Sequence, residues 1–437
     1  MSVFSGLANI GKVPELRRRI LFTLGMLAVY RVGVFVTIPG VDRNVMQAVM
    51  SKQSGGLLGM FNLFSGGALG NLSIFALGIM PYVSSSIILQ LLTMVFKPLD
   101  ELRKEGEQGQ RKINQYTRYG TVVLSFVQSF GMAMSLEAMN NGDLSDTARV
   151  GDVVTHPGWG FRFMSMLTLT TGTAFIMWVG EQITERGIGN GISLIIFAGI
   201  VDDIPSGVFR YFETNKGNIQ PLNLAAVTVI ILATVATIVF FERGQRKIPI
   251  YYARRTVGRR VYGGQTAHLP LRVNTSGTIP PIFASSLLMF PATLANFKLP
   301  GMAQLQNMLQ RGDWLFNTFY VLLIIFFCYF YTAVTFQAVD VADNLKKQST
   351  FIPGIRPGRS TAEYLGKVMG RITLAGALFL ALITVILPLL TAVLTGVPST
   401  SLYLGGTAIL IVVGVALDTM KQIETQLLMR QYKGFIK

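Results

Sequence analysis

The stretch that decides the fold is FNLFSGGALGNLSIFALGIMPYVSSSIILQLL, residues 61–92. It is apolar enough for a lipid bilayer, but the glycines within Gly66–Gly70 interrupt it, and Pro81 interrupts it again. An uninterrupted membrane-spanning helix needs about 20 consecutive apolar residues. The breaks predict a short half-helix over about Asn62–Asn71 and a second, kinked helix over Leu72–Val95. Irregular backbone at membrane depth is tolerated where it is buried in protein or lines a cavity. The pattern therefore fits a Pro-kinked helix in a bundle, or a pore or binding site.

A second stretch repeats this pattern 200 residues later. Gly78–Leu89 (GIMPYVSSSIIL) aligns with Thr278–Met289 (TIPPIFASSLLM), and most of the aligned pairs are apolar in both segments. The identical pairs are Ile79/Ile279, Pro81/Pro281, Ser85/Ser285 and Ser86/Ser286. Interrupted segments at matching places in two halves of a chain indicate a site between structural repeats.

The composition is that of a membrane protein. Of the 437 residues, 51% are hydrophobic and 14% are charged, whereas soluble domains carry about 25% charged residues. Apolar runs predict an all-α polytopic membrane protein with ten spans in one helical unit. The predicted spans are Ile20–Ile38, Leu72–Val95, Tyr119–Met139, Phe163–Gly180, Ile188–Val201, Leu222–Phe241, Thr278–Leu294, Trp314–Phe336, Ile372–Leu394 and Leu402–Leu417.

The distribution of charge predicts the orientation. Of the 38 lysines and arginines, 29 fall at the two ends and in the loops on their side of the membrane. Basic residues mark the cytoplasmic side, so both termini are expected to be cytoplasmic. Spans 2 and 7 are five apart and must cross in opposite directions. This predicts two inverted halves, residues 1–210 and 211–437, with a site near the midplane.

The sequence offers no catalytic, metal or cofactor site. There is no phosphate-binding loop, and the glycines of Gly187–Gly191 lack the context of a dinucleotide fold. His156 and His268 lie in polar segments outside the spans, and Cys328 lies alone in an apolar run. Arg31 is the clear charged residue inside a span, where it either snorkels or finds a partner.

Small and polar side chains mark one face of spans 2, 3 and 7. Small residues let helices approach closely, so this face indicates either tight packing or a seam that can part. The residues are Ser84, Ser85, Ser86, Gln90, Gln128, Ser285 and Ser286.

Two cytoplasmic loops combine arginines with aromatic residues. The loop between spans 6 and 7 reads ERGQRKIPIYYARRTVGRRVYGGQTAHLPLR, and its β-rich character, with Gly258, predicts a protruding hairpin. The loop between spans 8 and 9 contains TFIPGIRPGRST. Arginines at the tip of a long loop suit RNA or an acidic protein partner. The candidate contact residues are Lys247, Arg254, Arg255, Arg259, Arg260 and Arg356.

Several segments together resemble the SecY family of bacterial Sec translocase channel subunits. They include FNLFSGGAL, EGEQGQRKINQYTRYGT, GEQITERGIGNGIS, GRRVYGGQTAHLPL, IPPIFASSLLMFPAT and ADNLKKQSTFIPGIRPGRST, and the resemblance covers nearly the whole chain. The resemblance implies a ten-helix channel in the bacterial inner membrane, with spans 2, 3, 7 and 8 as a lateral gate.

The resemblance also implies two sealing elements. One is a plug helix made of Asn62, Leu63, Phe64, Ser65, Gly66, Gly67, Ala68, Leu69, Gly70, Asn71 and Leu72. The other is a pore ring made of Val83, Ile87, Ile192, Ile196, Ile282 and Ile411. Val83 and Ile87, like Ile192 and Ile196, are spaced i, i+4 and so share a helix face, a spacing that an ordinary core would also show.

The function implied is a passive channel that carries unfolded secretory polypeptides across the membrane and releases transmembrane segments into the lipid. The implied partners are SecE, SecG, the ATPase SecA, the ribosome with its RNA and proteins, and signal sequences and nascent chains. No cofactor is expected. A secondary transporter for a small solute would share the inverted repeat, but the spans lack the carboxylates it usually carries. An RNA-binding membrane anchor would explain the loops but leave the broken helices unused.

Overall fold

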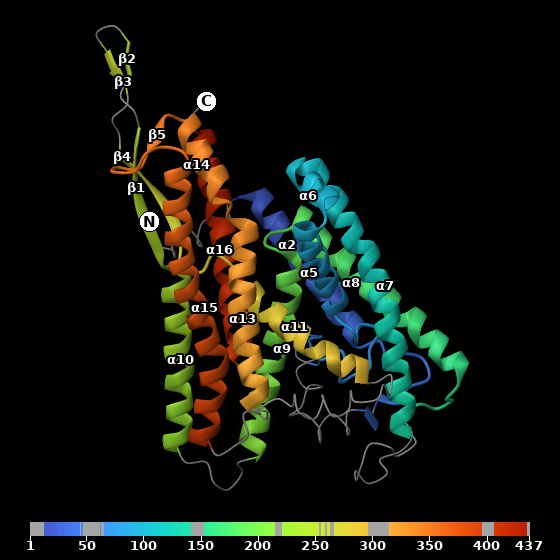
Figure 1. The fold of residues 1–437 in the computed structure, drawn as a ribbon. Coiled ribbons are helices and arrows are strands. Elements are labelled where there is room, and N and C mark those ends of the chain that lie inside the picture. The colour runs from blue at the N-terminus through green and yellow to red at the C-terminus, as the bar shows by residue number, and fades with distance from the viewer. Residues whose placement is uncertain are drawn as a thin grey trace.

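The computed structural model describes residues 13–43, 45–46, 62, 65–140, 153–214, 221–252, 255–257, 260–262, 266–295, 314–395 and 406–434. Within these ranges, ten helices correspond in order to the ten predicted spans (Figure 1). They are α2 (Pro14–Val34), α5 (Met80–Val95), α7 (Glu107–Asn140), α8 (Trp159–Arg186), α9 (Gly191–Thr214), α10 (Pro221–Arg243), α11 (Ile279–Ala295), α13 (Trp314–Thr335), α15 (Arg359–Thr395) and α16 (Gly406–Gly434).

Helix length and composition support part of the span count. In the described part of the chain, α7, α8, α13, α15 and α16 contain segments long and apolar enough to cross a membrane. A sixth candidate is α5 together with α6 (Lys97–Lys104), which meet at a bend of 99°. The apolar helical segments Gly191–Asp202 of α9 and Ile279–Leu288 of α11 are shorter. The complete set of ten spans stays a prediction.

The helices gather into two groups that lean together (Figure 1). One contains α10, α13, α15 and α16, and the other contains α2, α5, α7 and α8, with α9 and α11 between them. Helix α9 contacts both α8 and α16, while α11 contacts both α5 and α13. Helices α9 and α11, which lie between the two groups, therefore place side chains in the middle of the molecule.

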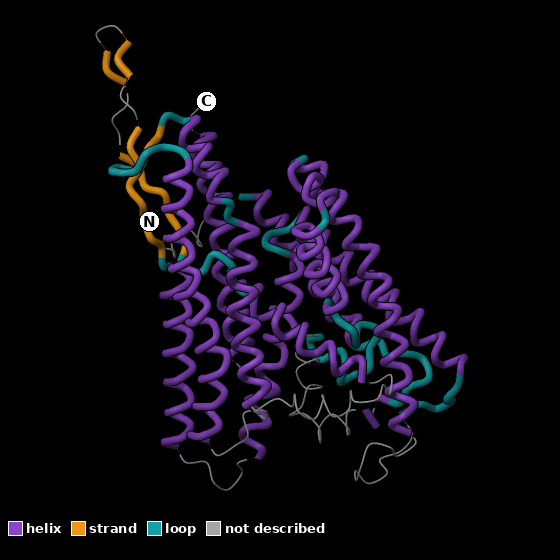
Figure 2. The backbone as a smooth tube through the Cα atoms, viewed as in Figure 1, coloured by secondary structure: helices purple, strands orange, loops and turns teal. Residues whose placement is uncertain are grey.

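A β-hairpin projects from one end of the bundle (Figure 2). Strands β1 (Gln245–Tyr252) and β4 (Thr266–Arg272) pair antiparallel, and β2 (Arg255–Val257) pairs with β3 (Arg260–Tyr262) further out. After the short helix α14 (Ala338–Lys347), strand β5 (Thr350–Phe351) adds to the free edge of β1. The predicted hairpin is confirmed, although Gly258 itself lies outside the described residues.

The hairpin base is anchored by its own apolar cluster. Ile248, Ile250 and Leu271 alternate with exposed positions along β1 and β4, as expected for strands with one buried face. They pack against Leu365 and Met369 of α15. This packing fixes the hairpin to the helices below it.

The glycine-rich break differs from its prediction in two ways. Residues 65–70, predicted as a half-helix, form turns, with Gly66 and Gly67 at φ +63° and +79°. That left-handed conformation favours glycine and interrupts a right-handed helix. The second helix begins at Met80 rather than Leu72, so Pro81 lies in its first turn, where a missing N–H costs nothing. Pro81 therefore starts α5 and does not kink it.

Candidate functional site

The predicted ring residues come from four helices and belong to, or pack against, one hydrophobic cluster. The buried members of one hydrophobic cluster include Val83 and Ile87 on α5, Ile196 on α9, Ile282 on α11 and Ile411 on α16, and Ile192 of α9 packs against them half-buried. The five buried side chains are at most 7% exposed. Sequence spacing placed four of these residues in pairs on two helices, and the structure puts both pairs in or against the cluster that contains Ile282 and Ile411.

The turns at residues 65–72 are packed against the same region. Ala68 is fully buried and belongs to the cluster that contains the ring residues. Leu69 and Leu72, also buried, belong to a neighbouring cluster with Leu136 of α7 and Leu169 of α8. Leu63 and Phe64 lie outside the described residues. The described part of the predicted plug therefore bridges the central cluster and the α7–α8 pair.

Local hydrogen bonds shape this segment. The Ser65 hydroxyl donates to the Asn62 carbonyl (3.0 Å) and accepts from the Leu69 amide (3.1 Å). The Asn62 side-chain carbonyl accepts from the Gly70 amide (2.7 Å). Further along, the Leu72 carbonyl accepts from the Ile38 amide (2.9 Å), just beyond the end of α2. The segment is therefore a compact set of turns tied at its far end to the chain that leaves α2.

Four of the five serines of the predicted seam, Ser85, Ser86, Ser285 and Ser286, make hydrogen bonds. The Ser85 hydroxyl donates to the Thr117 carbonyl (2.9 Å) and so joins α5 to α7. On α11, Ser285 and Ser286 each donate to the Ile282 carbonyl (2.8 Å), and Ser286 also lies 3.9 Å from the Met80 sulfur of α5. At this point of the α5–α11 contact, the Ser286 hydroxyl therefore meets a weak sulfur acceptor.

The side-chain amide of Gln90 in the predicted seam is less completely hydrogen-bonded than the serines. The Gln90 side-chain nitrogen donates to the Ser86 hydroxyl (3.2 Å), but its oxygen is buried and has no hydrogen-bond partner among the residues that the structure describes. Burying a polar atom without a hydrogen-bond partner costs free energy. Ser84 and Gln128 are half-buried. Ser84 and Gln90 lie on α5, and Gln128 lies on α7.

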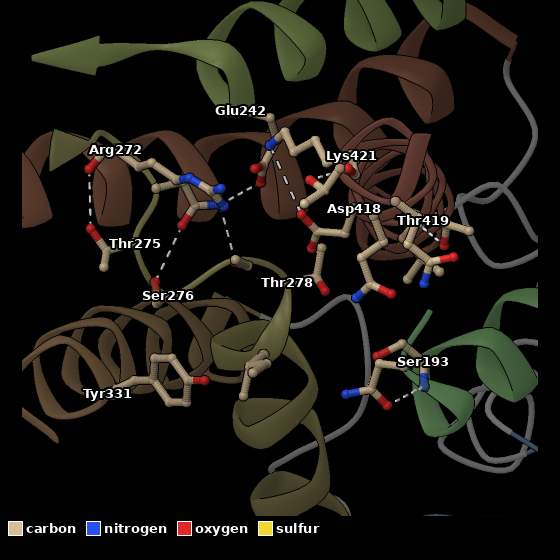
Figure 3. A pocket seen from close by; sticks show the side chains of 18 residues that line it. Ser193, Glu242, Arg272, Thr275, Ser276, Thr278, Tyr331, Asp418, Thr419 and Lys421 are labelled. Carbon is tan, nitrogen blue, oxygen red and sulfur yellow. Dashed lines mark hydrogen bonds and ion pairs between the residues drawn. The ribbon is translucent and has the colours of Figure 1, made fainter. Parts of the chain in front are cut away.

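A polar cleft of about 630 Å³ opens beside the ring (Figure 3). Its walls come from five parts of the chain: the start of α9 with Asn190 just before it, Glu242 of α10, the segment from Arg272 to the first residue of α11, Tyr331 of α13, and residues between Val415 and Gln426 of α16. Val415 lies one helical turn after Ile411, and Ile279 lies one turn before Ile282. The cleft therefore adjoins the ring along α9, α11 and α16.

Glu242 and Asn274 form the central contact of this cleft. The Asn274 side-chain nitrogen donates to a Glu242 carboxylate oxygen (2.6 Å) and to the Gly277 carbonyl (3.1 Å). Glu242 lies just beyond the apolar run of α10, and burial raises the pKa of its carboxyl, while the hydrogen bond from Asn274 partly opposes that shift. The pair ties the end of α10 to the connection between the hairpin and α11. Sequence analysis missed both residues, because neither spacing nor composition marks them.

The predicted contact residues lie at the hairpin end where they are described. Lys247 is exposed on β1, and Arg255 and Arg260 lie on β2 and β3. Arg254 and Arg259 lie outside the described residues. Arg356 is exposed between Gly354 and Gly358, both in the left-handed region, and its carbonyl accepts from the Thr361 hydroxyl (2.9 Å). The turn at Arg356 is therefore hydrogen-bonded to the start of α15.

Comparison with known proteins identifies the fold. The family model described as SecY matches residues 73–420. The protein translocase subunit SecY of Escherichia coli (strain K12) is 49% identical over 433 residues, which cover 98% of this chain and 95% of the relative.

Two solved structures share the fold at low sequence identity. One concerns the plug domain of a SecY protein, described as stabilising the closed state of its channel; it has a TM-score of 0.61 and 16% identity, and the match covers 95% of this chain and 96% of the other. The second is Sec61 in a canine ribosome–channel complex from the endoplasmic reticulum, with a TM-score of 0.59, 15% identity and the same coverage.

These similarities extend over nearly the full length of the chain and include the broken segment, the hairpin and the Arg356 turn. They establish a membrane channel subunit and not an enzyme. They confirm the family and the helical fold class that the sequence motifs predicted. The chain belongs to the SecY family of protein-conducting channel subunits.

Proposed function

We propose that the central cluster is the closed constriction of the channel and that the turns at residues 65–72 are its plug. The observation that carries this proposal is that Val83, Ile87, Ile196, Ile282 and Ile411 belong to one buried cluster that also contains Ala68. An apolar constriction excludes hydrated ions because water there has no polar partners. The polar cleft on one side then forms the hydrated approach for an unfolded polypeptide.

The plug is proposed to leave when a polypeptide enters. Ala68, Leu69 and Leu72 are buried but come from turns rather than from a long helix. Removing such a segment breaks few backbone hydrogen bonds of the helices around it. The segment can therefore move while the bundle stays folded.

The α5–α11 contact is proposed as the lateral gate, together with α7 and α13. Ser286 meets α5 through the Met80 sulfur at 3.9 Å, which is a weak hydrogen-bond acceptor. A signal sequence or transmembrane segment that enters between α5 and α11 therefore has to break little polar bonding between the two helices. It reaches the membrane lipid directly from the channel.

The hairpin end is proposed to be cytoplasmic and to receive the partners that supply energy. The ribosome and SecA would contact Lys247, Arg254, Arg255, Arg259, Arg260 and Arg356, and SecE and SecG would accompany the channel in the bacterial inner membrane. The start of α2 and the end of α16 lie at the same end of the bundle as the hairpin (Figure 1), which fits two cytoplasmic termini. The division into inverted halves, residues 1–210 and 211–437, belongs to this proposal.

The test is a disulfide cross-link to an arrested polypeptide. Cys328, the single cysteine, is replaced by alanine, and Ile282→Cys is introduced in the channel complex. A secretory polypeptide with one cysteine, stalled during transport, should cross-link to position 282. A matched Val123→Cys variant, on a side chain that is 64% exposed on α7, should not. Equal cross-linking at the two positions, or none at position 282, would refute the proposed path.

A further inference from the structure

Two arginines lie against the ring of Phe35, at the end of α2. The Arg31 guanidinium lies 5.2 Å from the ring centroid, and the Arg43 guanidinium lies 5.7 Å from it. Contacts of this kind hold a cation against an aromatic face. Phe35 is half-exposed, so packing around it does not by itself fix the ring. The two guanidinium groups and the aromatic ring therefore hold one another in position.

Arg31 reaches the first end of the turns at residues 65–71. One guanidinium nitrogen donates to the Gly66 carbonyl (3.0 Å), and another forms an ion pair with Asp202 of α9. Beside it, the buried Tyr30 hydroxyl donates to the Ser65 carbonyl (3.0 Å). Two consecutive residues of α2 therefore hold two consecutive carbonyls of the turn.

Arg43 reaches the other end of the same turns. A guanidinium nitrogen of Arg43 donates to the Asn71 side-chain carbonyl (3.1 Å). Between these ends, Asn62 and Gly70 are joined by a hydrogen bond of 2.7 Å, so the turn is a closed unit. Arg31 and Arg43 thus bind opposite ends of one compact segment while they share Phe35.

We propose that Arg31 and Arg43 are positioning residues that hold the plug in the closed channel. This inference rests on the proposed function of residues 65–72 as the plug. Asp202 is central to it, because an arginine without a partner at membrane depth is costly. When the plug leaves, Arg31 loses the Gly66 carbonyl but can keep Asp202 and Phe35. The clamp can therefore release and re-form without stranding a charge.

The expected effect follows from hydrogen bonds made by a charged donor. Such bonds are worth more than neutral ones, so losing either arginine should raise the open population of the resting channel by about tenfold. The readout is the labelling rate of Leu69→Cys, whose side chain is 1% exposed, in a Cys328→Ala background. A membrane-impermeant thiol reagent is applied to the resting channel complex from the side opposite the hairpin.

The variants are Arg31→Met with Asp202→Asn, which removes both charges together, and Arg43→Met. The matched control is Arg118→Met with Glu181→Gln, which removes an ion pair of 2.7 Å between α7 and α8. The clamp variants should label about tenfold faster than the parent, and the control should label at the parental rate. Arg31→Lys keeps the charge near Asp202 and should give an intermediate rate, and it carries the test if the double variant fails to insert.

Deleting residues 62–72 separates failure of the clamp from failure of the plug. Parental labelling rates in both clamp variants, combined with a raised ion conductance after the deletion, would refute the clamp and leave the plug intact. An unchanged conductance after the deletion would refute the plug assignment itself. Equal acceleration in the clamp variants and the Arg118 control would also refute the clamp, since the effect would not be specific to the plug.

Discussion

Replacing Gly66 with alanine should open the resting channel. The backbone conformation of Gly66 is unfavourable for a residue with a Cβ atom, and the added methyl group has no space. Gly66 has φ +63°, a conformation that costs a residue with a Cβ atom about 1–2 kcal/mol. A Cβ atom there would lie 2.7 Å from the Gly199 Cα of α9 and 2.7 Å from the Tyr30 hydroxyl. Overpacking of this kind costs typically about 1–3 kcal/mol. Even the lower sum, about 2 kcal/mol, lowers the ratio of closed to open channels by roughly 30-fold.

The assay for Gly66→Ala is the resting ion conductance of the purified channel complex in planar bilayers. Gly70→Ala is the matched control, since its Cβ atom would meet the Asn62 side chain at 3.1 Å and its φ is not in the left-handed region. We expect a large rise in conductance for Gly66→Ala and less than a threefold rise for Gly70→Ala. Equal conductance in Gly66→Ala and the parent would refute the close approach of the plug to α2 and α9.

Substitutions at three further positions test other contacts. Gly172→Ala should lower the thermal unfolding temperature, because its Cβ atom would collide with the Ile74 carbonyl oxygen; wild-type melting would contradict the packing of α8 on the turn before α5. Asn274→Asp places a second carboxylate next to Glu242 and removes a buried hydrogen bond, which should cost about 1–3 kcal/mol. We expect export to slow several-fold at normal protein abundance. Unchanged export in reconstituted vesicles would show that this contact does not position α11. Arg356→Glu, and less severely Arg356→Lys, should impair SecA-driven export at normal abundance, because lysine cannot bind a carboxylate or phosphate bidentately; wild-type export by both would leave Arg356 as a topology anchor.

The sequence predicted those elements whose pattern is local. Ten apolar runs marked the ten helices, and the β-rich loop marked the hairpin, because each pattern is written within one segment. The observed helices differ in length from the predicted spans mainly where polar residues continue a helix beyond the lipid. Helix α7, for example, starts at Glu107 rather than near Tyr119.

The break before α5 was predicted in place but not in conformation. Glycine spacing located it, yet spacing does not say which glycines adopt positive φ, and Gly66, Gly67 and Gly78 all do. Pro81 could either kink a helix or begin one, and the turns before Met80 decided in favour of a beginning.

The contacts that pattern could not predict join distant parts of the chain. Arg31 was recognisable as a charge in need of a partner, but Asp202 lies 171 residues away. The Glu242–Asn274 contact spans 32 residues between a helix end and a loop. Whether such side chains meet depends on how α2, α9, α10 and α11 pack, and hydrophobic periodicity carries no information about that. The ring residues were named from family resemblance, and the structure places them in one cluster.

The most direct test of the account is the resting ion conductance of the channel complex after Ile87, Ile196 and Ile411 are replaced together with serine. These three side chains come from α5, α9 and α16 and are at most 7% exposed. Hydroxyl groups would give water hydrogen-bond partners where the apolar cluster now offers none. A matched variant replaces Ile238, Phe316 and Ile324, buried in the same cluster but not assigned to the ring, with alanine. The account predicts that the serine variant conducts ions at rest and that the matched variant stays sealed. A sealed serine variant, or equal leakage in both, would contradict the assignment of the cluster as the channel's constriction.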